Sequence, residues 1–89
     1  KANQLTAIRE KYRGDARTDQ TRRLLEALRL FSVSTFEARR YLDIMHPAGR
    51  AQELRDQGHE IDTLRSSEPS DIGRPHVIAV YVLRREAGK

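Results

Sequence analysis

Cysteine and tryptophan are absent from this 89-residue chain, and proline (three residues) and glycine (five residues) are scarce. Without cysteine, the chain can form neither a disulfide nor a zinc site with thiolate ligands. No apolar run approaches the roughly 20 residues that span a bilayer, and the start of the chain shows no signal-peptide pattern. These absences predict no membrane partner and permit a reducing cytoplasm, and we expect a cytoplasmic location.

Residues suited to catalysis or metal binding are dispersed along the chain. The three histidines, His46, His59 and His76, share no ligand spacing, and no group of carboxylates stands beside them. The sequence contains neither a glycine-rich phosphate loop nor a nucleophile elbow. Its Asp and Glu residues are interspersed with Arg at helical spacing, which is typical of a solvated helix face. We therefore expect no enzymatic activity, no metal and no cofactor.

The excess positive charge lies at the N-terminal end. The formal net charge is +4; residues 1–23 carry seven basic and three acidic residues, whereas residues 24–89 carry ten of each. A basic arm over residues 1–17 could follow phosphates beside a globular domain, or could be a solvated tail. Leu5, Ile8 and Tyr12 stand at helical spacing, so a short extra helix or a dimer contact is a further interpretation. The charge favours an anionic partner, but it does not place that partner on the remaining residues.

Residues 34–58 have the pattern of two short helices joined by a tight turn. Ser34 can form a capping box with Glu37 at the start of the first helix. Pro47 suits the first turn of the second helix, and Gly58 can end it in a left-handed conformation. This is the layout of a helix-turn-helix. The expected inner side comprises Phe36, Ala38, Tyr41, Leu42, the turn residues Ile44 and Met45, and Ala51 and Leu54.

The flanking segments can complete a core that two short helices cannot form alone. Leucines and Phe31 at helical spacing predict a helix over residues 19–31, capped by Thr18 or Asp19. Ser32 and Val33 are expected to form a short extended link.

A β-hairpin is predicted after Gly58. Ile61 between polar residues fits a strand with one buried side, and the β-branched run over residues 76–83 is the strongest strand signal in the chain. The Ser, Pro, Asp and Gly residues between 65 and 75 predict a loop. The sequence thus predicts a helix, a helix-turn-helix and a two-stranded hairpin with a long tip.

Three helices followed by a hairpin are the element order of a winged helix, an α+β fold whose wing lies beside the recognition helix. The chain resembles the small winged helix-turn-helix domain found in many phage, prophage and bacterial proteins. The resemblance covers roughly residues 19–84 and rests on TFEAR (35–39), IMHPA (44–48), RAQELRDQGHEI (50–61) and GRPH with YVL (73–83). It implies a DNA-binding domain over residues 18–84, followed by a short tail (85–89), in a bacterial cell or a phage-infected host. Gly49 is a departure, since glycine inside a helix costs about 1 kcal/mol relative to alanine.

Base contacts are expected from the N-terminal half of the recognition helix, about residues 47–57, because that end enters the major groove. Gln52 could pair with adenine, and Arg50 or Arg55 with guanine. Arg50 could instead pair with Glu53 or Glu37, and Arg55 could bond a phosphate. The expected base-contacting set is His46, Ala48, Gly49, Arg50, Gln52 and Arg55.

Phosphate contacts are expected around the recognition helix, where they would fix the register of the protein on DNA. The candidates lie at the start and on the outer side of the first helix of the helix-turn-helix, and in the wing. Ser34 could instead serve as a helix cap alone. The expected set is Ser34, Thr35, Arg39, Arg40, Arg65 and Arg74.

These predictions favour a regulator, or an accessory factor in phage-type DNA transactions, whose partner is double-stranded DNA. A homodimer would allow paired half-sites to be read, although no zipper pattern is present. The alternative is a winged-helix module that binds protein, because a fold does not fix its use. RNA binding ranks below both, since the isolated tyrosines form no stacking platform.

Overall fold

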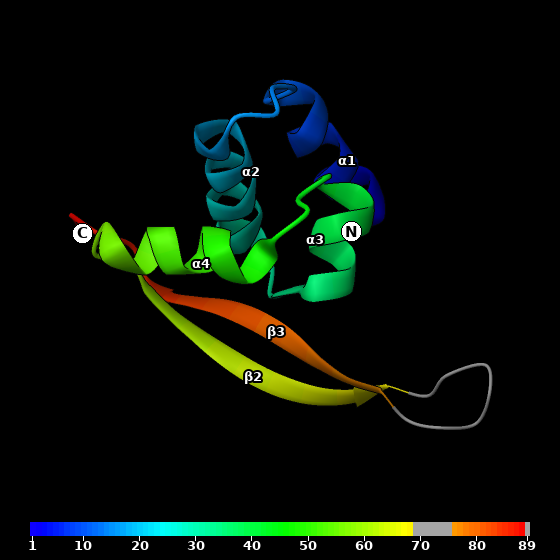
Figure 1. Ribbon diagram of the computed structural model, residues 1–89, viewed down its shortest axis with the longest axis vertical. Coiled ribbons are helices and arrows are strands. Elements are labelled where there is room, and N and C mark those ends of the chain that lie inside the picture. Colours follow the sequence, from blue (N-terminus) through cyan, green and yellow to red (C-terminus); the bar gives the residue numbers. More distant parts are fainter. Residues whose placement is uncertain (69–75, 89) are drawn as a thin grey trace.

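The computed structural model of the chain describes residues 1–68 and 76–88. A body of four helices lies on one side of a small antiparallel sheet, and the hairpin extends beyond this body (Figure 1). The elements in chain order are α1 (Ala2–Lys11), α2 (Arg17–Leu30), β1 (Val33–Ser34), α3 (Thr35–Tyr41), α4 (Pro47–Asp56), β2 (Glu60–Glu68) and β3 (His76–Arg85). The predicted α+β winged-helix order is confirmed.

The sheet has the strand order β1-β3-β2, so the expected two-stranded hairpin is extended by a third strand. Val33 pairs with Tyr81 and Ser34 with Val80. The prediction that a loop begins at Arg65 is wrong, since Arg65 pairs with Ala79 within β2. Strand pairing uses backbone groups, so the polar composition of this segment does not prevent it.

The core joins all four helices to the sheet. Leu24 of α2, Leu42 after α3, Leu54 of α4 and Tyr81 of β3 belong to one buried cluster. Leu5 of α1 lies in the same cluster and is fully buried. The N-terminal segment therefore forms the extra helix that its apolar spacing allowed, and it packs against α2 and α3.

Local signals set the ends of the helix-turn-helix as expected. The Ser34 hydroxyl accepts a hydrogen bond from the Glu37 N–H at 3.0 Å, and the Glu37 carboxylate accepts one from the Ser34 N–H at 2.9 Å. Pro47 is the first residue of α4, and Gly58 follows its end with φ of +101°. The capping box and both ends of α4 are confirmed.

Three local expectations are wrong. Helix α2 begins at Arg17 after Ala16, which makes no side-chain cap, and not after Thr18 or Asp19. Met45 and Phe36, expected on the inner side, are 76% and 58% exposed. The core is filled by the neighbouring residues Ile44 and Ala38, so helical spacing alone did not identify which apolar residues are buried. Among the described residues, no helix is long and apolar enough to cross a membrane.

Candidate nucleic-acid interface

The exposed side of α4 carries small and polar side chains near its N-terminus. His46, Ala48 and Gln52 are exposed, and Gly49 is partly exposed. The His46 ring lies over Gly49, where an added Cβ would be 2.4 Å from Cδ2 of the imidazole. The absence of a side chain at residue 49 therefore leaves room for the histidine ring.

Gln52 donates from Nε2 to the Asp56 carboxylate at 3.1 Å, one helical turn further on. This contact is exposed and its partner is another surface side chain, so an incoming hydrogen-bond acceptor can replace it at little cost. Gln52 can therefore give up its hydrogen bond to Asp56 and form one with a bound ligand instead.

Arg50 was expected to face outward, but its side chain points into the protein. The residue is 9% exposed, and its Nη2 lies 2.9 Å from Oε1 of Glu53. Oε2 of Glu53 in turn accepts a hydrogen bond from the Thr21 hydroxyl of α2 at 2.9 Å. The ion pair with Glu53 is the alternative that the sequence left open, and it connects α4 to α2 and turns Arg50 away from the open side.

Arg55 is held against the sheet. Its Nε donates to the Ile61 carbonyl at 2.9 Å, and its Nη2 donates to the Thr63 hydroxyl at 2.7 Å. The side chain is only partly exposed. Arg55 therefore fixes the C-terminal half of α4 to β2, and a contact with DNA would have to use its remaining donor atoms.

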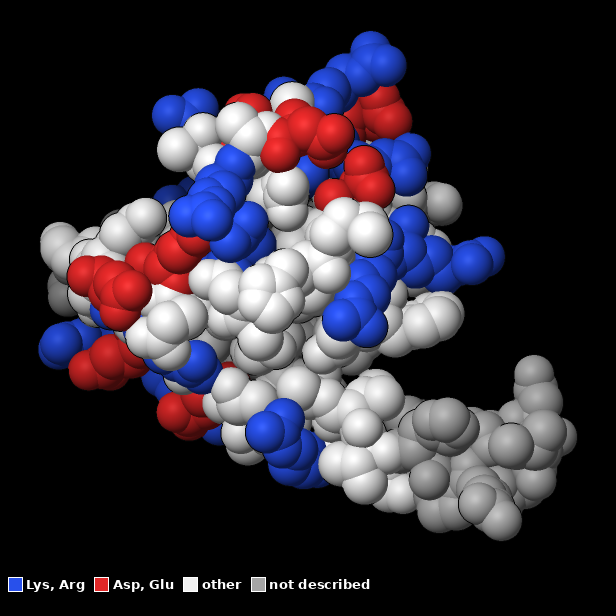
Figure 2. Space-filling view, viewed as in Figure 1, with Lys and Arg blue, Asp and Glu red and all other residues white. Residues whose placement is uncertain are grey.

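A groove of about 550 Å³ lies between α3 and β3, lined by Thr35, Phe36, Arg39, Arg40 and Ile78. Both arginines are exposed, and no carboxylate pairs with either of them within residues 1–68 and 76–88. The Arg40 guanidinium lies 5.7 Å from the centre of the Tyr41 ring. Figure 2 shows basic side chains on the part of the helical body that faces the hairpin. Arg39 and Arg40, together with the exposed Phe36 ring, suit an anionic ligand with apolar parts.

The remaining candidates for phosphate contacts differ in exposure and in the hydrogen bonds that they already form. Ser34 is buried, and its hydroxyl is engaged in the capping box. The Thr35 hydroxyl donates to the Ala79 carbonyl at 3.3 Å, whereas Arg65 is exposed on β2. Arg74 lies outside the described residues.

Four of the seven basic residues between residues 1 and 23 form ion pairs within the protein. Lys11 contacts Glu26 at 2.9 Å, and this hydrogen bond raises the pKa of Lys11. The Tyr12 side chain, followed by Lys11, holds the pKa of Glu26 below its usual range. Similar ion pairs join Lys1 to Glu37, Arg9 and Arg13 to Glu10, Arg29 to Glu86, Arg84 to Asp62, and Arg85 to Glu60. The charge available to a partner is therefore smaller at the N-terminus than the sequence suggested.

Two arginines were missed as site candidates by the sequence analysis. Arg17 and Arg22 of α2 are exposed and line a pocket of about 520 Å³ with Gln57 at the end of α4. The sequence showed them only as part of a charge excess, because their approach to α4 depends on how the two helices pack. Glu53 and Asp56 line the same pocket, so its charge is mixed.

A helix-turn-helix whose second helix leads directly into an antiparallel hairpin defines the class of winged-helix proteins. A family model described as a winged helix-turn-helix domain matches residues 19–86, and the chain belongs to that family. Helix α1 precedes the matched region. No curated protein sequence and no solved structure matches the chain.

Proposed function

We propose that the protein binds double-stranded DNA without catalysing a reaction, with α4 in the major groove and the hairpin beside it as a wing. Winged-helix domains present their recognition helix in this way. The observation that carries the proposal is that exposed polar and small residues at the start of α4 lie in the same domain as Arg39 and Arg40, which have no acidic partner among the described residues.

Base contacts in this proposal come from His46, Ala48 and Gln52, with Gly49 leaving room for the His46 ring. Met45 joins them, since an exposed thioether at the start of α4 can pack on a thymine methyl group. Arg55 contributes through the donors that it does not use on β2. Arg50 is left out because its guanidinium is paired with Glu53 and faces α2.

Phosphate contacts in this proposal come from Arg39 and Arg40 of α3 and from Arg65 of β2. Thr35 lines the same groove, and its hydroxyl donates to the Ala79 carbonyl. Arg74, which lies outside the described residues, is included as a phosphate contact on the sequence alone. These contacts would orient the domain, while α4 would read the bases.

The biological role that we propose is transcription regulation or an accessory part in phage-type DNA transactions, in the cytoplasm of a bacterial or phage-infected cell. A homodimer would read two half-sites separated by about one turn of DNA. This role rests on the resemblance of the motifs, and DNA binding would stand without it.

The test is fluorescence anisotropy with mixed-sequence duplex DNA over a salt series. Each phosphate contact contributes a slope of about −0.9 to log K against log salt. The variant R39Q/R40Q is expected to flatten the slope by up to about 1.8, whereas R84Q should leave it unchanged because Arg84 is paired with Asp62. An absence of binding at low salt, or an equal effect of both variants, would refute the proposal.

A second candidate function is protein binding, which one feature of β3 favours. Ala79, Tyr81 and Leu83 pack on the core, and Val80 and Val82, which alternate with them along β3, are partly exposed. A strand with one solvated face usually alternates with polar residues. Wild-type protein that binds no duplex DNA in the salt series would favour this candidate.

A further inference from the structure

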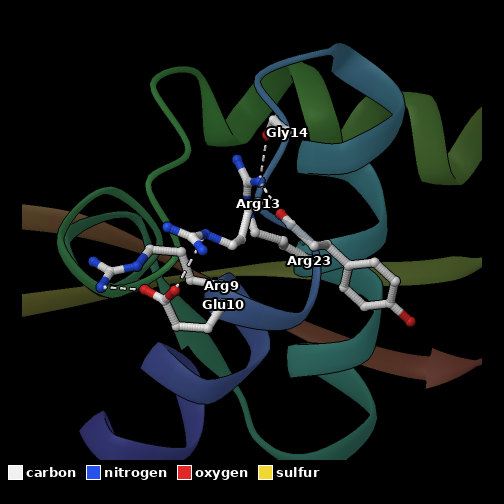
Figure 3. Close-up of polar contacts among 6 residues, drawn as sticks. Arg9, Glu10, Arg13, Gly14 and Arg23 are labelled. Atoms are coloured by element: carbon white, nitrogen blue, oxygen red, sulfur yellow. Dashed lines mark hydrogen bonds and ion pairs between the residues drawn. The ribbon is translucent and has the colours of Figure 1, made fainter.

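Arg23 is a buried cation at the centre of the helical body. It lies in the middle of α2 and is 1% exposed. Its Nη1 donates to the carbonyls of Tyr12 and Gly14, the latter at 2.6 Å (Figure 3), and its Nη2 donates to the carbonyl of Asp43 at 3.2 Å. One side chain therefore joins the connection between α1 and α2 to the turn between α3 and α4.

No carboxylate forms an ion pair with Arg23 in the part of the chain that the structure describes, and its Nε has no hydrogen-bond partner there. Its charge is therefore compensated by carbonyl dipoles. Burying a charge is costly unless the surrounding groups bond to it. The fixed fork of a guanidinium can bond several carbonyls at once, which a lysine ammonium on a flexible stem does poorly.

The Asp43 carbonyl belongs to the residue that reverses the chain direction. Among the described residues, Asp43 is the non-glycine residue with a positive φ, at 54°. The next residue, Ile44, donates its N–H to the Ala38 carbonyl at 3.1 Å and has a fully buried side chain. The left-handed conformation costs free energy for a residue with a Cβ, so bonds from outside the turn help to maintain it.

We propose that Arg23 is a positioning residue for α4: by holding the Asp43 carbonyl, it fixes the angle between α3 and α4 and makes the α1 connection part of the same unit. This inference rests on the proposed function, because the angle determines which bases α4 can reach. Residues 12–14 lie before the region that the family model matches. The N-terminal helix is thereby coupled to DNA reading without contacting DNA.

The experiment compares R23M, R23K and the control R13M in the full chain. R13M also removes one positive charge near the connection between α1 and α2, but Arg13 is exposed and its ion pair, at 3.4 Å, is with the exposed Glu10 (Figure 3). A preferred duplex is first selected with wild-type protein from a random library. The ratio of its affinity to that of a scrambled duplex is then measured at a temperature at which urea unfolding shows every variant to be folded.

R23M is expected to lower this ratio by roughly tenfold, the scale of one lost base contact, with an unchanged salt slope because the phosphate-binding arginines remain. R23K should fall between R23M and wild type, and R13M should match wild type. A purely structural role for Arg23 would lower stability but leave the ratio of the folded variants intact, and that outcome would overturn the proposal. If R23M does not fold, R23K decides by the same criterion.

Amide hydrogen exchange separates this inference from the proposed function. The Tyr12 N–H donates to the Ile8 carbonyl, and the Ile44 N–H reports on the turn. Both amides should exchange faster in R23K than in wild type. The control is the His59 N–H, which donates to the Leu54 carbonyl and whose exchange rate should not change. Wild-type protein that binds no DNA would refute the proposed function and the coupling to DNA reading, but not the role of Arg23 in fixing the turn. Unchanged exchange at Ile44 would refute the role of Arg23.

Discussion

The imidazole of His46 lies directly over the backbone of Gly49, at the start of the helix that we propose reads DNA. A Cβ on residue 49 would be 2.4 Å from Cδ2 and 3.1 Å from Nε2 of that ring. His46 is exposed and makes no side-chain cap bond, so its ring is able to rotate away. The two residues therefore form one small surface whose shape depends on the missing side chain.

Replacing Gly49 by Ala is expected to stabilise the protein by about 1 kcal/mol, the difference in helix propensity. The new methyl group should at the same time displace the His46 ring and weaken DNA binding. Urea unfolding and anisotropy measure the two effects. In an H46A background, G49A should stabilise equally without a further loss of affinity; a stabilised G49A protein with unchanged affinity would exclude His46 from the interface.

Replacing Leu5 by Ala is expected to destabilise the protein by about 2–5 kcal/mol, because it leaves a cavity in the core. Leu5 is fully buried although it belongs to the N-terminal helix. The matched control is L30A, since Leu30 on α2 is 59% exposed. Urea unfolding should show one cooperative transition for both variants. Equal stability of L5A and L30A would mean that α1 does not fold with the rest of the domain.

Stability should fall at acidic pH in part through Glu37. Burial raises its pKa, but the Ser34 N–H and the Lys1 ammonium outweigh burial and bring the pKa below its usual range. A lowered pKa in the folded state gives stability that is complete above the unfolded pKa of about 4.3 and is lost as pH falls through the folded value. Unfolding free energies from pH 7 downward test this.

The variant E37Q should show a shallower decline of stability below about pH 5 than wild type. Glutamine can still accept a hydrogen bond from the Ser34 N–H, so the capping box is preserved. Identical pH profiles for the two proteins would assign the acid sensitivity to other groups, of which Glu26 is the first to consider because its pKa is also lowered.

Arg50 and Gln52 should separate stability from sequence reading. R50M is expected to destabilise the protein by about 1 kcal/mol, because the partly buried Glu53 carboxylate loses its cation and keeps only the Thr21 hydroxyl, while the preferred DNA sequence stays the same. Q52A should leave stability nearly unchanged and weaken binding to the preferred duplex by about 1–3 kcal/mol. Urea unfolding measures the effect on stability, and competition between duplexes measures the effect on sequence preference. If R50M changed the preferred DNA sequence, Arg50 would have to be counted among the base-contacting residues.

The helix-turn-helix was predictable because its ends carry local signals. The capping box at Ser34, Pro47 at the first turn of α4 and Gly58 after its end each act within a few residues. The third strand was not predictable in the same way. Two residues, Val33 and Ser34, form β1, and they pair with a strand near the other end of the chain.

The orientation of Arg50 was available from the sequence but was obscured by its charge. The buried residues of α4 follow the i, i+3, i+4, i+7 spacing of an inner helix face. They are Pro47, Arg50, Ala51 and Leu54. Arg23 likewise adjoins the buried positions of α2. Spacing indicates that such residues face inward, whereas the partners that make their burial possible come from distant segments and appear only in the folded structure.

The pairing of Val33 with Tyr81 joins residues separated by more than half of the chain. Such pairing requires a large loop to close before any contact compensates for the lost chain entropy. The helices can form early from local contacts, whereas β1 has no partner until β3 is available. During synthesis, β1 therefore cannot join the sheet until β3 has been made and has left the ribosome.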